Sequence, residues 1–292
     1  MIQKVAIQGI QGSFHHQVAL EYYHQDIEVD ECMSFEELVD SLLSGKSNQA
    51  VMAIENSIAG SIIPNYALID KNNLHVIGEY YMDIHQNFMA LKGQKIEDIS
   101  EVHSHPMALL QCMEFLKKLP NIKVVEDKDT AETARRIHQN QLTGIAAIAS
   151  KTASKMYDLE ILAPEIQTIN NNMTRFVILN KENSFVPKSE INKASLKFEL
   201  EHKRGSLAAV LNVMSDCKLS LTKIQSLPKI ETPWKYSFFV DVTFDDYNDY
   251  SKAKSLLEIM AEYFKVLGEY KNTKPSPLPP KGELVEQKIV IF

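Results

Sequence analysis

The feature that most constrains the fold of this chain is the alternation of short β-rich runs with helical patterns over residues 1 to about 182. This alternation predicts an α/β fold with a mainly parallel sheet, because each crossover helix returns the chain to the start of the next strand. Capping signals mark helix starts at Ser34, with Glu37 three residues on, and at Asp129, with Glu132. The strands are predicted at 4–8, 27–32, 50–54, 74–82, 86–91, 101–104, 122–126, 145–148 and 174–180.

A second pattern follows a predicted linker at 183–193. Its strands and helices have the order β-α-β-β-α-β, which is typical of a ferredoxin-like domain over residues 194–272. The remaining residues, 273–292, hold four of the eleven prolines within Pro275–Pro280, so we expect an extended tail there.

Composition excludes several classes of protein. A net charge of −7 without a Lys/Arg cluster argues against a nucleic-acid partner. No run approaches the roughly 18 apolar residues of a membrane span, and the N-terminus lacks the pattern of a signal peptide. Three scattered cysteines fit reduced thiols in a cytoplasmic protein, and no His/Cys cluster has metal-ligand spacing.

Four polar segments stand where a predicted strand ends or a helix begins. They are Gly9–Phe14, Glu55-Asn56-Ser57, Ser104-His105-Pro106 with Gln111 two turns along, and Thr174-Arg175-Phe176. Open α/β sheets bind ligands at such positions, because helix N-termini direct free N–H groups at anions. A hydroxyl, a fixed positive charge and an aromatic ring in one tripeptide suit a small anionic substrate.

With these four motifs, in this order and spacing, the chain resembles the monofunctional prephenate dehydratases from residue 1 to about 272. Ser13 stands where the family usually has Thr, and His15 where it usually has Ser. The resemblance implies a bilobal, periplasmic-binding-protein-like catalytic domain at 1–182, followed by an ACT domain at 194–272. Lobe one would comprise about 1–80 and 160–182, and lobe two about 81–159.

The implied reaction converts prephenate to phenylpyruvate with loss of carbon dioxide and water, and it requires no cofactor and no metal. We expect Thr174 to donate to the leaving hydroxyl, with Glu55 as the alternative acid, and Asn56, Ser104 and Gln111 to orient the substrate. Substrate contacts are expected from Arg175, Phe176, Ser57 and Ser13. Two alternatives stay open: strand alternation can direct Arg175 away from the Thr174 face, and Ser57 can cap a helix instead.

The resemblance also implies an effector site for phenylalanine in the second domain and a homodimer or homotetramer. The effector motif is altered here, since Gln225-Ser226-Leu227-Pro228 stands for Glu-Ser-Arg-Pro and Ser220 for Asn, so we expect inhibition to be retained but weakened. Gly205-Ser206-Leu207 would open the helix that grips the effector. The competing functions are arogenate dehydratase, which acts on the amino analogue, and a non-catalytic small-ligand sensor with an ACT module.

Overall fold

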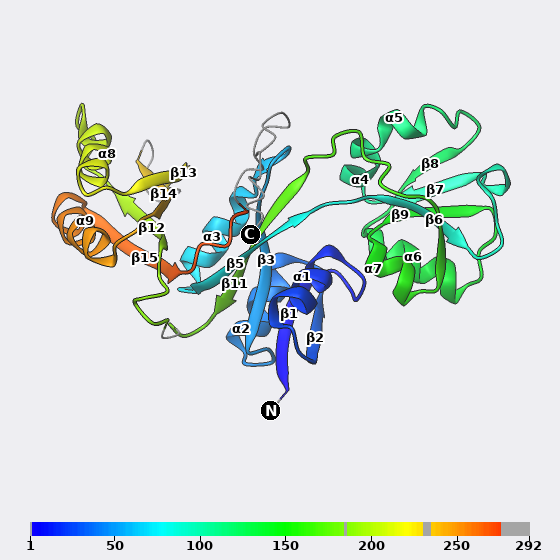
Figure 1. Ribbon diagram of the computed structural model, residues 1–292, viewed down its shortest axis with the longest axis horizontal. Helices are drawn as coiled ribbons and strands as arrows, with labels where there is room; N and C mark the ends of the chain where they lie inside the picture. The colour runs from blue at the N-terminus through cyan, green and yellow to red at the C-terminus, as the bar shows by residue number, and fades with distance from the viewer. Residues whose placement is uncertain (1, 184–185, 230–234, 276–292) are drawn as a thin grey trace, which may run out of the picture.

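The computed structural model describes residues 2–183, 186–229 and 235–275, so most of the predicted tail lies outside the described residues. Three sheets organise the chain, with six, five and four strands (Figure 1). The first two belong to two lobes joined by two crossing segments, and the third belongs to the C-terminal domain. The predicted bilobal α/β fold followed by a β-α-β-β-α-β domain is confirmed.

Lobe one is built on the six-stranded sheet, in which β4 pairs with β3 beside the path β2-β1-β3-β11-β5. Strand β11 returns from lobe two and runs antiparallel between β3 and β5. The strands are β1 (Gln3–Gln8), β2 (Ile27–Cys32), β3 (Gln49–Asn56), β4 (Gly60–Ser61), β5 (His75–Asp83) and β11 (Met173–Asn180).

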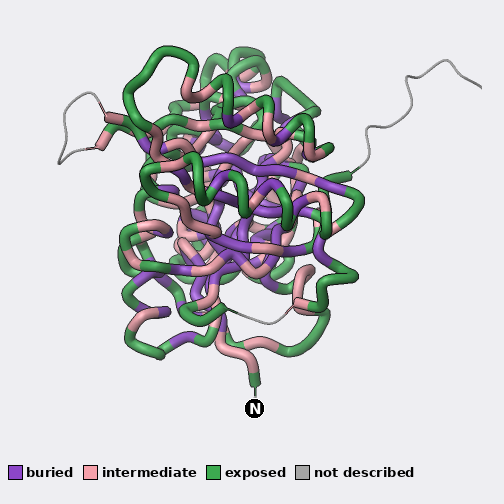
Figure 2. Tube along the Cα trace, turned by 90° about the vertical axis from the view of Figure 1, so that its left-hand side faces the viewer, coloured by how far each residue is buried: buried purple, intermediate pink, exposed green. Residues whose placement is uncertain are grey.

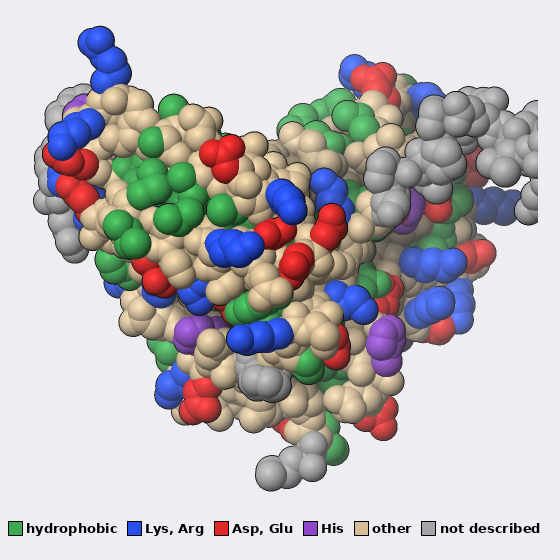
Figure 3. Space-filling model, turned by 60° about the vertical axis from the view of Figure 1, so that its left-hand side comes forward, with side chains coloured by type: hydrophobic (Ala, Val, Ile, Leu, Met, Phe, Trp, Pro, Cys, Tyr) green, Lys and Arg blue, Asp and Glu red, His purple; other side chains and the backbone are tan. Residues whose placement is uncertain are grey.

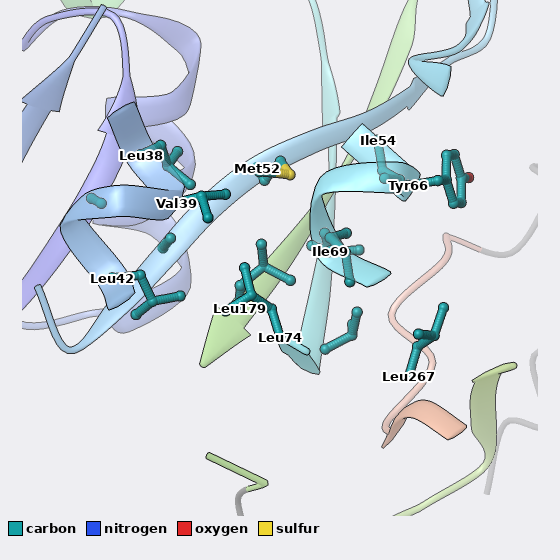
Figure 4. Close-up of a cluster of buried hydrophobic side chains, with 14 of the residues drawn as sticks. Leu38, Val39, Leu42, Met52, Ile54, Tyr66, Ile69, Leu74, Leu179 and Leu267 are labelled. Atoms are coloured by element: carbon teal, nitrogen blue, oxygen red, sulfur yellow. The ribbon is translucent and has the colours of Figure 1, made fainter. Parts of the chain in front are cut away.

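Helices cover both faces of this sheet. One face packs against α1 (Phe14–Tyr23) through a core that includes Val51 and Phe176. The other face packs against α2 (Phe35–Leu43) and α3 (Ile63–Lys71), and Figure 4 shows their side chains converging on Met52 and Leu179. The central strands β1, β3 and β11 therefore alternate between two cores, as buried strands do.

Lobe two is built on the five-stranded sheet of order β10-β6-β9-β7-β8. Helices α4 and α5 pack on one face through a core that includes Phe88, and α6 and α7 pack on the other through Met89. The strands are β6 (Asn87–Leu91), β7 (Glu101–Ser104), β8 (Lys123–Glu126), β9 (Ile145–Ala149) and β10 (Leu159–Ala163). The helices are η1 (Ile96–Asp98), α4 (Pro106–Gln111), α5 (Met113–Leu116), α6 (Thr130–Gln139) and α7 (Lys151–Met156).

Two expectations about these lobes are wrong. The sheets are mixed rather than mainly parallel, because the two crossing segments bring β11, β6 and β10 in antiparallel. The strand β10 was not predicted, and it pairs with β6 in lobe two, although residues from 160 on were assigned to lobe one. The second crossing therefore follows Ala163.

The C-terminal domain has the sheet order β13-β14-β12-β15. Its two helices, α8 (Ser206–Asp216) and α9 (Tyr247–Met260), pack on one face around Tyr250 and Met214. The strands are β12 (Lys193–Glu199), β13 (Ser220–Pro228), β14 (Tyr236–Thr243) and β15 (Tyr263–Tyr270).

The helix-free face of this third sheet packs on lobe one. Phe239 forms an edge-to-face contact with Tyr66 at 5.5 Å between ring centroids, and Leu267 joins the lobe-one core. At Gly268 the backbone of β15 approaches so closely that an added Cβ would lie 2.0 Å from the carbonyl oxygen of Val76. The tube in Figure 2 places buried residues mainly toward the middle of the molecule, with exposed residues around them.

The surface carries no single-sign field on the face drawn in Figure 3, where acidic and basic side chains are interspersed. No helix in the described part of the chain is both long and apolar enough to cross a membrane.

Candidate active site

A cleft of about 240 Å³ lies between the two lobes. Lobe one contributes the ends of β1, β3 and β11 and the start of α1, and lobe two contributes the starts of α4 and α6. The floor includes Thr174, Asn56 and Phe176, and the opposite wall includes Gln111 and Lys128. The N-termini of three helices therefore border one cavity, which favours an anionic ligand.

The register between β3 and β11 sorts the motif residues onto two faces. Thr174 pairs with Asn56 and Arg175 pairs with Glu55, and a bulge at Ile54 shifts the register just before these pairs. A bulge adds one residue to a strand and so reverses which residues share a face beyond it. As a result, the Thr174–Asn56 pair lines the cleft, whereas the Arg175–Glu55 pair faces the C-terminal domain.

Asn56 is held in one orientation by four hydrogen bonds. Its Oδ1 accepts from the backbone N–H groups of Ile58 (3.0 Å) and Ala59 (2.9 Å). Its Nδ2 donates to Asn172 Oδ1 at 2.7 Å and to Thr174 Oγ1 at 2.8 Å. Because Thr174 Oγ1 accepts from the amide, its own proton is free to point elsewhere, and the residue lines the cleft.

Three other predicted site residues also line the cleft. Ser13 caps α1 by accepting from the N–H of His16 at 3.2 Å, and Gln111 accepts at Oε1 from Gln86 Nε2 at 3.3 Å. Phe176 lies on the Thr174 side of β11 and is nearly fully buried, so little of its surface borders the cavity. These residues supply a hydroxyl, an amide and an aromatic wall.

The structure directs four predicted residues elsewhere. Glu55 binds Lys223 Nζ of β13 at 2.6 Å, so it faces the C-terminal domain rather than the cleft. Ser104 is fully buried and donates to the carbonyl oxygen of Ile148 at 2.6 Å. Ser57 neither lines the cleft nor caps α3; its hydroxyl donates to the carbonyl of Asn171 at 3.2 Å.

Arg175, the fourth, is buried between lobe one and the C-terminal domain. Its guanidinium binds Glu79 at 2.7 Å, the phenol oxygen of Tyr270 at 2.8 Å, and Asp241. Lys193 completes the cluster by binding Glu79 at 2.7 Å. Burial alone would raise the pKa of Asp241, but the charge and hydrogen bond of Arg175 outweigh it and hold that pKa below its ordinary value. The expectation that Arg175 clamps a substrate carboxylate is wrong in this geometry.

The cleft contains four ionisable groups that were not predicted as site residues: His15, His105, Lys128 and Asp129. Among the described residues that line the cleft, Lys128 is the one Lys or Arg. Its ammonium forms no ion pair with any described residue. Asp129 caps α6 by accepting from Ala131 and Glu132, each at 2.9 Å, and burial raises its carboxyl pKa despite those bonds. His15 also lines the cavity. Nothing in the sequence set Lys128 apart except its place before a helix cap.

The predicted effector residues do not form one site within this chain. Gly205 precedes α8 with a positive φ of 87°, and Ser206 and Leu207 line a small pocket with Lys203 and Tyr236. The others lie on the edge strand β13 and do not line that pocket, although Ser226 and Pro228 pair with Phe238 and Tyr236, which do. Leu227 packs toward the lobe-one core. These strand residues are Ser220, Gln225, Ser226, Leu227 and Pro228.

No cluster of three or more His, Cys, Asp or Glu side chains suited to a metal ion is present among the residues that the structure describes.

Comparisons with known proteins agree with this architecture. Residues 5–184 match the family model described as prephenate dehydratase. The chain is 32% identical over 276 residues to the bifunctional chorismate mutase/prephenate dehydratase of Buchnera aphidicola, covering 93% of this chain and 72% of that protein. It is 35% identical over 277 residues to the chloroplastic arogenate dehydratase/prephenate dehydratase 2 of Arabidopsis thaliana, covering 91% and 72%.

Among solved structures, prephenate dehydratase from Arthrobacter aurescens, in complex with L-Phe, superposes with a TM-score of 0.83 at 22% identity. The match covers 95% of this chain and 93% of that one. At this identity the likeness speaks for the shared fold, including the C-terminal domain.

Proposed function

This chain belongs to the prephenate dehydratase family, and we infer that it converts prephenate to phenylpyruvate with loss of carbon dioxide and water. It is a lyase of phenylalanine biosynthesis. That it carries this activity alone stays a prediction. We propose roles for the cleft residues, and the observation that carries them is the hydrogen-bonded pair Thr174–Asn56 on the floor of the interlobe cleft.

Thr174 supplies the hydrogen bond that the leaving group needs. In the reaction the ring–carboxylate bond breaks to give carbon dioxide, and its electron pair completes the aromatic ring as the carbon–oxygen bond breaks. The departing hydroxide takes a proton and leaves as water. Asn56 donates to Thr174 Oγ1, so the threonine proton is available to the departing oxygen. A preorganised donor of this kind stabilises charge as it develops.

The acid that replenishes this proton is not Glu55, because Glu55 is bound to Lys223 outside the cleft. Asp129 is the carboxyl that lines the cavity, and burial raises its pKa, which favours a protonated fraction. We therefore propose Asp129, rather than Glu55, as the group that exchanges protons with the cleft.

The carboxylate that the substrate keeps needs positive charge. Arg175 binds Glu79 on the side of β11 that faces away from the cleft, so we propose Lys128 as the cation that binds the pyruvyl carboxylate. Helix α6 begins two residues further along the chain, and the positive N-terminal end of its dipole adds to the attraction for an anion. Gln111 and Ser13 then orient the remaining oxygens, and Phe176 borders the ring.

Turnover of prephenate by the purified protein tests the activity, with phenylpyruvate followed by its absorbance in alkali. Arogenate is assayed alongside, because the relatives carry both names. Preference for arogenate would assign the amino analogue as substrate. Absence of turnover on both, with ligand binding retained, would favour the non-catalytic sensor.

We further propose that residues 194–272 are an ACT domain through which phenylalanine controls the reaction. Two contacts join the C-terminal domain to the strands of the cleft pair: Glu55 of β3 binds Lys223 of β13, and Arg175 of β11 binds Asp241 of β14. Each of these residues is the chain neighbour of a member of the pair Asn56–Thr174. A movement of the C-terminal sheet would therefore pull on the same two strands that carry the cleft pair. Coupling of this kind is commonly about 1–3 kcal/mol.

Titration calorimetry with phenylalanine, together with activity at rising phenylalanine, tests this control. Because the effector residues of one chain are split between α8 and the exposed edge strand β13, we propose that a second copy completes the site in a homodimer or homotetramer. Sedimentation with and without phenylalanine measures that assembly. Binding by a strict monomer would exclude a shared site.

We also propose a cytoplasmic location. Cys32 and Cys112 are buried free thiols, which fits a reducing compartment.

A further inference from the structure

His15 lies at the cleft floor, where a hydrogen bond from the backbone and contacts with two aromatic rings fix its side chain. Its Nε2 accepts from the buried backbone N–H of Ala53 at 3.2 Å. Its ring meets Phe176 edge-on at 5.0 Å between centroids and Phe35 at 5.8 Å. Only 8% of the residue is exposed, and that part lines the cleft.

The contact with Ala53 decides where the imidazole carries its proton. A nitrogen that accepts a hydrogen bond has no proton, so in the neutral ring the proton sits on Nδ1. Burial lowers the pKa of His15 to about 3, so the ring stays neutral at physiological pH. His15 thus offers one N–H donor with no charge.

That donor has no partner in the part of the chain that the structure describes. No described residue hydrogen-bonds to Nδ1, and this atom is not among the enclosed polar atoms that lack a partner. Because the side chain lines the cavity, the Nδ1–H group opens into the cleft. An unpaired donor at the floor of a binding site is available to a ligand oxygen.

We propose that His15 donates from Nδ1–H to the ring carboxylate of the substrate, the group that leaves as carbon dioxide. This inference rests on the proposed function. A carboxylate that must lose its charge is best held by a neutral donor, because a cation would stabilise the ground state more than the transition state. The aromatic walls of Phe35 and Phe176 keep the surroundings apolar, whereas the exposed Lys128 suits the carboxylate that persists.

Two substitutions separate donation from packing. His15→Gln keeps an acceptor for Ala53 and an N–H donor for the cleft, whereas His15→Phe keeps the ring and removes both. We expect His15→Phe to raise KM for prephenate by about tenfold or more with a smaller change in kcat, and His15→Gln to restore KM to within about threefold. A folded His15→Phe protein with the parent's KM and kcat would overturn the proposal.

Nitrogen NMR of His15 tests the donor directly, and it does not depend on the folding of His15→Phe. Thr174→Ala protein, in which turnover is slow, is titrated with prephenate and separately with phenylpyruvate, which lacks the ring carboxylate. We expect a proton on Nδ1, and a shift of that N–H signal with prephenate but not with phenylpyruvate. A proton on Nε2, or equal shifts with both ligands, contradicts the proposal. Loss of turnover in the parent protein would instead contradict the proposed function.

Discussion

Thr174 and Arg175 are neighbours on one strand, yet their side chains meet different parts of the molecule. Thr174 accepts a hydrogen bond from Asn56 in the interlobe cleft, and Arg175 is buried behind the strand against Asp241 of the C-terminal domain. The two halves of one short motif therefore face different places, one the interlobe cleft where we propose that the reaction occurs and one the domain interface.

Removing the Thr174 hydroxyl is predicted to abolish most turnover. Losing a preorganised donor commonly lowers kcat by on the order of a hundredfold or more. Thr174→Ser keeps the hydroxyl and should retain measurable activity, whereas Thr174→Val keeps the shape without it and should behave like Thr174→Ala. Steady-state kinetics with prephenate gives the comparison. Full activity in Thr174→Ala would remove this residue from the mechanism.

Lys128 is predicted to affect substrate binding more than chemistry. In Lys128→Ala we expect KM for prephenate to rise by about tenfold or more, because a charge-assisted contact to a carboxylate contributes about 1.5–3 kcal/mol. The increase should shrink at high salt, which screens the exposed charge in the parent. Lys118→Ala, at an exposed position of lobe two outside the cleft, is the matched control. Equal kinetic effects in both variants would contradict a specific role.

Arg175→Met is predicted to destabilise the protein rather than to weaken substrate binding. The substitution leaves Asp241 and Glu79 buried with one fewer cation, and breaking such a pair costs about 3–5 kcal/mol. Arg135→Met removes a partly exposed pair with Glu132 and should cost less than about 1 kcal/mol. Urea unfolding measures both. An increase in KM for prephenate at an unchanged free energy of unfolding would show that Arg175 binds the substrate.

The stability of the protein is predicted to fall in mild acid partly through His15. In the folded state burial keeps its pKa at about 3, whereas the unfolded chain takes up a proton near the ordinary value of 6.5. Between these values the unfolded state binds more protons, so stability falls as pH decreases, by at most about 1.4 kcal/mol per pH unit from this group.

His15→Gln lacks this contribution, so its free energy of unfolding should decrease less between pH 7.5 and 5.5. His202→Gln, at an exposed position, should follow the parent. Denaturant titrations at the two pH values make the comparison. Parallel decreases in the parent and in His15→Gln would show that the imidazole is not buried in its neutral form.

The sequence predicted elements well where local signals act alone. Ser34 and Asp129 cap their helices as expected, because a short polar side chain before an apolar pattern is a local preference. The mixed pairing of the sheets was not predictable in the same way. It depends on the sheet positions that β6, β10 and β11 take after the two crossing segments, and a local sequence pattern does not predict those positions.

The site was predicted only in part for a related reason. Strict alternation along β3 does not account for Glu55, because the bulge at Ile54 changes the face on which it lies. A bulge arises from register between strands about 120 residues apart in sequence, which a single strand does not reveal. Lys128 joins the cleft through the packing of lobe two against lobe one, so its residue type and position gave no signal.

The insertion of β11 between β3 and β5 also constrains the order in which the two lobes can fold during synthesis. The strands of lobe two are continuous in sequence, from Asn87 to Ala163, whereas the sheet of lobe one stays open until Met173–Asn180 has emerged. A nascent chain can therefore complete lobe two while β3 and β5 still present unpaired edges. The segment that closes those edges also carries Thr174, so the sheet of lobe one cannot be completed before Thr174 is in place beside Asn56.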